Sequence, residues 1–315
     1  MPLNPFLAKK SHLLEGLGWA DLQSDPEAMA RFTEYFRDPD QWTMPDISVE
    51  DRKVPGPHGE VPVRIYSPRD TSHGAVLWLH GGGFSSGDLD MPEAHLVSAE
   101  LAARARTSVV SVDYRLAVDG THYPVPVDDA HAAWLWLAGE WSARSGPICL
   151  GGASAGAALA LSTAIRLRDR DELRPAALLL AYPFVHFPAP ALDETAAARM
   201  RDVPQLLRFT TESIEHMVHT YAGRLTDLPP DAMPGAANLA GLPPTGLVLS
   251  EYDDLRPSGD LLARQLEESG VPVRTYLATG MMHGHLNRGP SLEEVDRSLD
   301  FFVATLLGRP PALDE

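Results

Sequence analysis

The sequence contains little cysteine and little positive charge. Cys149 is the single cysteine among 315 residues, which excludes an internal disulfide framework and any multi-cysteine zinc or iron–sulfur site. The 26 lysines and arginines are outnumbered by 43 aspartates and glutamates, so the formal net charge is −17. This charge argues against nucleic acid or an anionic membrane surface as the main partner, and it leaves a small-molecule ligand as the expectation.

Long apolar runs are also missing. The longest stretch without a charged or strongly polar residue, 176–185, is about half of the ~20 residues that a membrane-spanning helix needs. The N-terminal sequence, MPLNPFLAKKSHLLEGLG, does not combine a basic start with an uninterrupted apolar stretch, so we expect no secretory signal. We therefore expect a cytoplasmic protein with no membrane span.

From about residue 49 the sequence alternates short β-rich runs with longer helical patterns. One of these runs, AVLWL at 75–79, is apolar throughout, as a strand covered on both faces should be. The alternation predicts an α/β protein whose sheet is mostly parallel and carries helices on both faces. The predicted strands are Val61–Tyr66, Ala75–Leu79, Ser108–Asp113, Ile148–Leu150, Ala176–Ala181, Gly246–Leu249 and Val273–Leu277.

Two segments do not follow this alternation. Residues 1–48 and about 186–226 have helical patterns instead, and the second segment includes a predicted helix at Gln205–Tyr221. Because such segments cannot extend the sheet, we expect both to form a helical cap over one of its edges, with residues 49–315 as the catalytic domain. For residues 1–48 the alternative is a segment that only braces that domain.

The sequence GASAG at 152–156 follows the predicted strand at 148–150 and precedes the helical run Ala157–Leu167. A G-x-S-x-G sequence between a strand and a helix is typical of the nucleophile elbow, a tight turn that lifts the serine hydroxyl above the sheet edge. Small neighbours are needed because the chain approaches itself closely there. This pattern predicts Ser154 as a nucleophile.

A second glycine-rich sequence, HGGGF at 80–84, also follows an apolar strand. Consecutive glycines leave backbone N–H groups uncovered, so Gly82 and Gly83 are able to approach a ligand oxygen. Together with the N–H of Ala155, they would form an oxyanion hole for the tetrahedral intermediate of an ester. A phosphate-binding turn is the alternative, but no Walker or G-x-G-x-x-G pattern accompanies the glycines.

A serine nucleophile needs a base that a carboxylate orients, and in this layout the chain order is serine, acid, histidine. Asp253, in SEYDDLR, follows one predicted strand, and His283, in GMMHGH, follows another. Both therefore fall at the carboxyl edge of the sheet, where the elbow also lies. Spacing alone does not separate them from their neighbours, which are Asp254 and Glu251 for the acid and His285 for the base.

These motifs resemble those of the hormone-sensitive-lipase-like family of α/β-hydrolases, the bacterial carboxylesterases with an HGGG motif. The resemblance implies an α/β-hydrolase fold, a possible homodimer and catalytic roles for Asp253 and His283, the first residues of the family's D-x-L-R and H-G patterns. It also implies a structural role for His80. The matching sequences, in order over about residues 49–307, are HGGGFSSGD at 80–88, DYRLA at 113–117, GASAG at 152–156, LAGLPP at 239–244, EYDDLR at 251–256 and MHGH at 282–285.

Some residues depart from the family pattern. Ala153 and Ala157 replace the Asp and the final Gly of the usual GDSAGG, and Val118 and Asp119 replace the Pro-Glu that usually follows DYRLA. His285 stands where the family commonly has an aromatic residue. None of these positions belongs to the predicted triad, so we expect the departures to affect substrate preference.

The combined expectation is a cofactor-independent serine hydrolase that cleaves carboxylic esters of short to medium acyl chain, without a metal. An amidase or arylformamidase on the same triad is one alternative, and a receptor-like binding protein on the same fold is another. Glu212, His216 and His219 share a helical face by spacing, but a metal site there is the less favoured interpretation.

Overall fold

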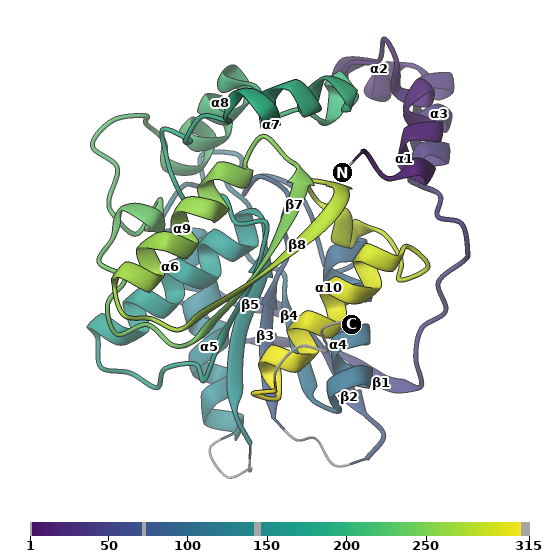
Figure 1. The fold of residues 1–315 in the computed structure, drawn as a ribbon. Coiled ribbons are helices and arrows are strands. Elements are labelled where there is room, and N and C mark those ends of the chain that lie inside the picture. Colours follow the sequence, from purple (N-terminus) through teal and green to yellow (C-terminus); the bar gives the residue numbers. More distant parts are fainter. Residues whose placement is uncertain (1, 71–73, 142–145, 310–315) are drawn as a thin grey trace.

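An eight-stranded sheet forms the centre of the molecule (Figure 1). The computed structural model describes residues 2–70, 74–141 and 146–309. The strand order is β1-β2-β4-β3-β5-β6-β7-β8; β2 runs antiparallel to both of its neighbours, and the pairs from β4 to β8 are parallel. The strands are β1 (Ile47–Val54), β2 (Val61–Pro68), β3 (Ala75–Leu79), β4 (Ser108–Val112), β5 (Ile148–Ala153), β6 (Leu178–Ala181), β7 (Thr245–Tyr252) and β8 (Val273–Met282).

Helices cover both faces of the sheet (Figure 1). Successive side chains of β3 point to opposite faces, so Leu77 joins one buried cluster and Trp78 joins the other. This arrangement explains why AVLWL is apolar at every position. The first cluster lies under α5 (Val125–Trp141), α6 (Ala155–Asp169) and α9 (Arg256–Glu268), and the second lies under α4 (Pro92–Ala105) and α10 (Glu293–Leu306).

The predicted α/β fold is confirmed, with differences at some elements. β1 was not predicted, because six of its eight residues are exposed and its sequence, ISVEDRKV, is mostly polar. The strand predicted at Ala176–Ala181 begins only at Leu178. The predicted strand ends at Asp113, Leu150 and Leu249 differ from the observed ends by one to three residues. Residues 1, 71–73, 142–145 and 310–315, which the predicted ranges included, lie outside the described residues.

The two segments outside the alternation contain mainly short helices, which lie over the carboxyl edge of the sheet above β7 and β8 (Figure 1). The helix predicted at Gln205–Tyr221 is wrong as a single element, because residues 208–210 are extended and Thr210 caps a new helix. Residues 37–46 are not helical. The helices here are α1 (Pro5–Lys10), α2 (Trp19–Ser24), α3 (Pro26–Phe36), α7 (Glu194–Arg199) and α8 (Thr211–Ala222), with 3-10 turns at Ser11–Leu14, Met200–Asp202 and Gln205–Leu207.

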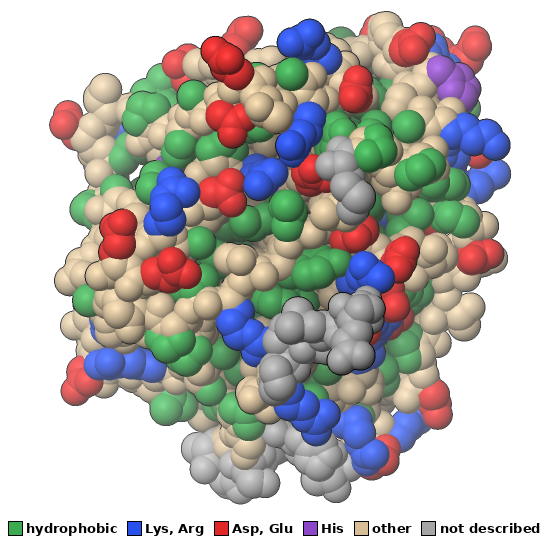
Figure 2. Space-filling model, in the orientation of Figure 1, with side chains coloured by type: hydrophobic (Ala, Val, Ile, Leu, Met, Phe, Trp, Pro, Cys, Tyr) green, Lys and Arg blue, Asp and Glu red, His purple; other side chains and the backbone are tan. Residues whose placement is uncertain are grey.

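The first helical segment and residues 200–206 of the second pack into one buried cluster with the sheet, whereas Ile214, Val218 and Tyr221 of α8 belong to the other cluster. Leu7 and Leu14 of the first segment belong to the same cluster as Met200 and Leu206 of the second. On the face that Figure 2 shows, acidic and basic side chains are interspersed. No helix among the described residues is long and apolar enough to cross a bilayer.

Candidate active site

Ser154 occupies the tight turn between β5 and α6, with φ of 52° and ψ of −116°. Its backbone N–H donates to the carbonyl of Ala181 at 2.9 Å, which fixes the turn against the end of β6. A side chain at Gly156 would place its Cβ 2.1 Å from the carbonyl oxygen of Leu79, so only glycine lets α6 begin this close to β3. The Ser154 hydroxyl is therefore held at the carboxyl edge of the sheet and at the start of a helix.

The structure brings Ser154 together with His283 and Asp253. The Oγ of Ser154 lies 2.8 Å from Nε2 of His283. The Nδ1 of the same ring lies 2.7 Å from Oδ2 of Asp253. Asp253 is buried, and its other oxygen, Oδ1, accepts the N–H of Leu255 at 2.8 Å. A carboxylate held in this way orients the imidazole so that Nδ1 carries a proton and Nε2 accepts one.

The rival acids bind other groups. Asp254 accepts Nε and Nη2 of Arg208 at 2.8 and 2.9 Å, and it also accepts the N–H of Phe209 at 2.8 Å. Glu251 accepts Nη1 of Arg199 at 2.9 Å and the N–H of Gly280 at 2.8 Å. Among the three carboxylates that the sequence left open, Asp253 is therefore the one in hydrogen-bond contact with His283.

The rival histidine, His285, is buried between two serines. Its Nδ1 lies 2.9 Å from Oγ of Ser250, and its Nε2 lies 3.0 Å from Oγ of Ser298. Because Ser298 donates its own proton to the carbonyl of Glu294 at 2.6 Å, it accepts from Nε2, and Nδ1 accepts from Ser250. Burial and the nearby charge of His283 lower the pKa of His285 to about 3, so its ring is neutral at neutral pH.

The charges around His283 favour its protonated form. Burial lowers the pKa of His283, but the charge of Asp253 and the hydrogen bond to it raise this pKa, and Glu93 and Asp254 add to the rise. The net pKa lies above the ordinary histidine value. A histidine in this setting is well suited to take a proton from Ser154, because the imidazolium that results is stabilised.

The glycine loop after β3 adopts backbone angles that suit glycine, with φ of 107° at Gly82 and 60° at Gly83. Within the described residues, the N–H groups of Gly82, Gly83 and Ala155 have no protein acceptor.

Below the loop, His80 stacks on Tyr114 with ring centroids 4.4 Å apart. The Tyr114 hydroxyl donates to the carbonyl of His80 at 2.8 Å, so this pair supports the loop from the sheet side.

Two side chains of the inserted segment, which the sequence did not single out, lie over this site. The Phe209 ring packs edge-on against the imidazole of His283, with centroids 4.7 Å apart. Met217 of α8 lies over the glycine loop, because a Cβ added to Gly83 would fall 3.0 Å from its Sδ. Neither position has a local sequence signal, since the partners lie more than 70 residues away along the chain.

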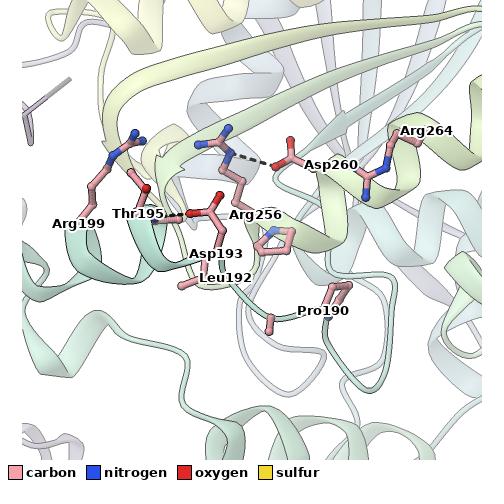
Figure 3. Close-up of a pocket in the computed structure, with 11 residues that line it drawn as sticks. Pro190, Leu192, Asp193, Thr195, Arg199, Arg256, Asp260 and Arg264 are labelled. Atoms are coloured by element: carbon pink, nitrogen blue, oxygen red, sulfur yellow. Dashed lines mark hydrogen bonds and ion pairs between the residues drawn. The ribbon is translucent and has the colours of Figure 1, made fainter.

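Two cavities are lined by residues of the inserted segment, and neither includes Ser154. A cavity of about 350 Å³ between α7 and α9 is lined by charged side chains, and Figure 3 shows Arg199 and Arg256 extending into it, with Asp260 3.2 Å from Arg256. A second hollow, of about 280 Å³, is lined by Phe187, Phe209 and other residues that include Asp254. The second hollow adjoins the candidate site, because Phe209 lines it and also contacts His283.

The other residues that the sequence analysis named are the three possible metal ligands on α8 and the single cysteine. Glu212, His216 and His219 on α8 are all exposed, and no group of three potential metal-ligating side chains comes together in the described part of the chain. Cys149 is buried in β5, and burial raises the pKa of its thiol to about 12. A neutral, buried thiol is a poor nucleophile.

The parallel sheet, the elbow serine and its hydrogen-bonded histidine and carboxylate together define the class of protein as an α/β hydrolase. A family model described as alpha/beta hydrolase fold matches residues 76–287. The chain belongs to this family, the hormone-sensitive-lipase-like α/β-hydrolases that its motifs resemble.

Named relatives are similar over most of the chain. Esterase LipI of Mycobacterium tuberculosis is 37% identical over 261 residues, which cover 79% of this chain and 78% of that protein. An arylesterase of Saccharolobus solfataricus is 32% identical, covering 75% of this chain and 76% of its own length. Among solved structures, an esterase of Pyrobaculum calidifontis superposes with a TM-score of 0.79 at 30% identity, covering 98% of this chain and 99% of its own.

Proposed function

We propose that this chain is a carboxylesterase that hydrolyses esters of short to medium acyl chain through an acyl-enzyme on Ser154. The observation that carries the proposal is the line of contacts from Ser154 through His283 to Asp253, at 2.8 and 2.7 Å. The names of the relatives, an esterase and an arylesterase, agree with it. The machinery consists of amino-acid side chains and backbone groups, so no cofactor enters the proposal.

In the first half of the reaction, Ser154 Oγ attacks the ester carbonyl carbon while Nε2 of His283 takes the hydroxyl proton. Asp253 holds the ring in the required tautomer and stabilises the imidazolium. The backbone N–H groups of Gly82, Gly83 and Ala155 bind the oxyanion of the tetrahedral intermediate. The C–O bond then breaks, and His283 returns the proton to the departing alcohol, which leaves an acylated Ser154.

In the second half, His283 takes a proton from water as the water oxygen attacks the acyl carbon. A second tetrahedral intermediate forms in the same oxyanion hole. Its collapse breaks the bond to Ser154 Oγ, and the proton on His283 goes back to that oxygen. The carboxylic acid leaves, and the free enzyme is restored.

The proposed preference for short and medium acyl chains follows from what covers the site. We propose that residues 1–48 and about 186–226 act as a cap, in which Phe209 and Met217 limit the room above His283 and Gly83. The hollow of about 280 Å³ beside Phe209 is the place we assign to part of the substrate. The cytoplasmic location and the homodimer expected from the sequence stay predictions.

The test combines turnover with covalent labelling. Wild-type enzyme and Ser154→Ala are assayed on aryl esters of increasing acyl length beside matched amides, and both are treated with a fluorophosphonate. We expect the substitution to abolish labelling and to lower turnover by roughly 10⁴–10⁶. Alanine suits the buried elbow, so unfolding midpoints should agree. Labelling of another serine in the variant would contradict the assignment, and turnover of amides but not esters would favour the amidase alternative.

A further inference from the structure

A buried glutamate that the proposed mechanism does not use lies directly beneath the glycine loop. Glu93, in the first turn of α4, is 1% exposed. Its Oε1 accepts the N–H of Gly81 at 2.8 Å. Its Oε2 accepts the hydroxyl proton of Tyr182 and lies 3.4 Å from the side-chain amide nitrogen of Asn287. Glu93 therefore joins the glycine loop to the residues around His283.

The fit between Glu93 and the loop is close. A Cβ added to Gly81 would lie 2.3 Å from Oε1 of Glu93, so the carboxylate occupies the space that a side chain at Gly81 would need. On the other side of the same residue, the carbonyl oxygen of Gly81 lies 2.7 Å from Nδ1 of His80. Glu93 thus holds the N–H of the His80–Gly81 peptide, and His80 contacts the carbonyl of the next peptide, Gly81–Gly82. Because Glu93 holds Gly81 on the N-terminal side of the Gly81–Gly82 peptide, it restricts the orientation of that peptide, whose N–H we place in the oxyanion hole.

The hydrogen bonds around Glu93 favour the charged carboxylate. Burial raises the pKa of Glu93 above its ordinary value, and the Tyr182 hydroxyl, the charge of His283 and the Gly81 N–H offset only part of this rise. The N–H of Gly81 and the amide of Asn287 are donors. Tyr182 takes a backbone hydrogen bond from Leu286, which leaves its own proton for Glu93. Groups that only donate are matched by an ionised acid, because a protonated acid would need an acceptor.

The negative charge of Glu93 acts on the proposed base. The Tyr182 ring packs against the imidazole of His283 with centroids 4.9 Å apart, so the carboxylate on the Tyr182 hydroxyl is a near neighbour of that ring. Asp253 supplies the first charge and Glu93 a second one, both of which favour the imidazolium. In a buried site such charges act with little screening by solvent.

We propose that Glu93 is a positioning residue for ester hydrolysis, which holds the N–H of Gly81 so that the following Gly82 N–H faces the oxyanion, and which adds negative charge beside His283. The inference rests on the proposed function of Ser154, His283 and Asp253. It assigns two separable roles to one carboxylate, since the hydrogen bond to Gly81 needs only an acceptor oxygen and the effect on His283 needs the charge.

Two substitutions separate these roles in full-length enzyme assayed on a short-chain aryl ester. Glu93→Leu removes the acceptor, and we expect kcat to fall about 10- to 100-fold with KM changed less than about threefold, because an oxyanion donor acts mainly in the transition state. Glu93→Gln keeps an acceptor for Gly81 and should retain most of kcat. Its loss of charge should move the acid limb of the kcat/KM profile to lower pH.

The matched control is Glu100→Gln on the same helix. Glu100 is also buried, but its oxygens bind Arg104 and Trp42 rather than the glycine loop. We expect this control to leave kcat and the acid limb unchanged. If Glu93→Leu does not fold, Tyr182→Phe serves in its place, because it removes only the hydroxyl that holds Oε2, and it should lower kcat about threefold or more.

The outcomes distinguish the inference from the function on which it rests. A wild-type enzyme without ester turnover or fluorophosphonate labelling would overturn the proposed function, and this inference with it. An active wild type whose Glu93→Leu variant, or Tyr182→Phe in its place, has the same kcat would overturn the inference alone. So would a Glu93→Gln variant that is as slow as Glu93→Leu, or one whose acid limb does not move.

Discussion

Asp253 and Asp254 are neighbours in the sequence, yet their carboxylates serve different parts of the molecule. Asp253 lies 2.7 Å from the imidazole of His283, whereas Asp254 holds the guanidinium of Arg208 through both of its oxygens. Asp254 also accepts the N–H of Phe209, the residue whose ring covers His283. One carboxylate therefore contacts the proposed base directly, and its neighbour holds the segment that lies above that base.

This difference predicts unequal effects of removing the two charges. Asp253→Asn should lower kcat by roughly 10³–10⁴, because an amide no longer stabilises the correct tautomer of His283. Asp254→Asn should retain much of kcat and mainly raise KM, since it loosens Arg208 and Phe209 rather than the base. Steady-state kinetics on one aryl ester measure both parameters. Equal losses of kcat in the two variants would show that the role of the acid has been assigned to the wrong position.

The pH dependence of activity gives a second prediction. Hydrolysis needs neutral His283, so activity is lost as the pH falls through the pKa of this ring. Burial lowers that pKa, but the charge of Asp253, the hydrogen bond to Asp253 and the charges of Glu93 and Asp254 together outweigh burial and raise it. We therefore expect the acid limb of kcat/KM to have its midpoint above about 6.5, the ordinary histidine value. A midpoint clearly below that value in wild-type enzyme would contradict the proposed electrostatics.

The elbow and the glycine loop were predictable because their constraints are local. The turn at Ser154 needs glycine at positions 152 and 156. The chain order serine, acid, histidine then predicted the regions of the acid and the base, and the family resemblance selected Asp253 and His283 over their neighbours. The strands that precede the elbow and the glycine loop were also predictable, since a strand buried on both faces is apolar at every position. The edge strand Ile47–Val54 lacks this signal, because water covers most of its residues.

The residues around the triad were not predictable, because their roles arise from contacts between distant parts of the chain. Glu93 lies 89 residues from Tyr182, and Arg208 lies 46 residues from Asp254. In the sequence alone, Glu93 reads as an acidic residue in the first turn of a helix, where it would complement the helix dipole. Nothing in its neighbourhood along the chain indicates that it faces the glycine loop.

A third prediction concerns stability and His285. In the unfolded chain a histidine takes up a proton below pH about 6.5. Folded His285 does so only at a pKa of about 3. The unfolded state therefore binds more protons between these values, so this group lowers the free energy of unfolding as the pH falls from about 6.5 toward 3.

Replacing His285 removes this contribution. In His285→Phe, the slope of the free energy of unfolding against pH should become smaller by up to about 1.4 kcal/mol per pH unit in that window. At pH 8 the variant should be less stable than wild type, because Ser250 loses the acceptor of its hydroxyl proton. Urea unfolding at several pH values measures both effects. An unchanged slope would mean that folded His285 titrates normally.

A fourth prediction tests the cap through Met217. Its Sδ lies close to the glycine loop, so Met217→Ala should open space above Gly83. Each additional methylene that becomes buried is worth about 0.8 kcal/mol, or roughly fourfold in kcat/KM. The ratio of octanoyl to acetyl ester turnover should therefore rise several-fold in this variant. His216→Ala, an exposed position on the same helix, is the matched control and should leave that ratio unchanged.

The last prediction separates the two interpretations of residues 1–48. This segment is tied to the loop that follows His283. Arg288, which is 4% exposed, donates to Oδ1 of Asp38 at 3.1 Å and to the carbonyl of Tyr35, also at 3.1 Å. The guanidinium also lies over the Tyr35 ring, 4.9 Å from its centroid. Deleting residues 1–40 would leave this buried charge without its partner and would expose apolar side chains of the cluster beneath.

We expect the truncated protein to be less soluble, to have a lower kcat and to distinguish less between acyl lengths, because a covering segment would bury part of the acyl chain. Asp38→Asn is the companion variant: it weakens the tie to Arg288 but keeps the segment, so it should lower stability and leave the acyl-length profile unaltered. The measurement is kcat/KM over acetyl to dodecanoyl esters for the three proteins. A truncated enzyme that stays soluble and keeps the wild-type profile would mean that the segment only braces the domain, and the acyl preference would then have to come from Phe209, Met217 and the rest of the inserted segment.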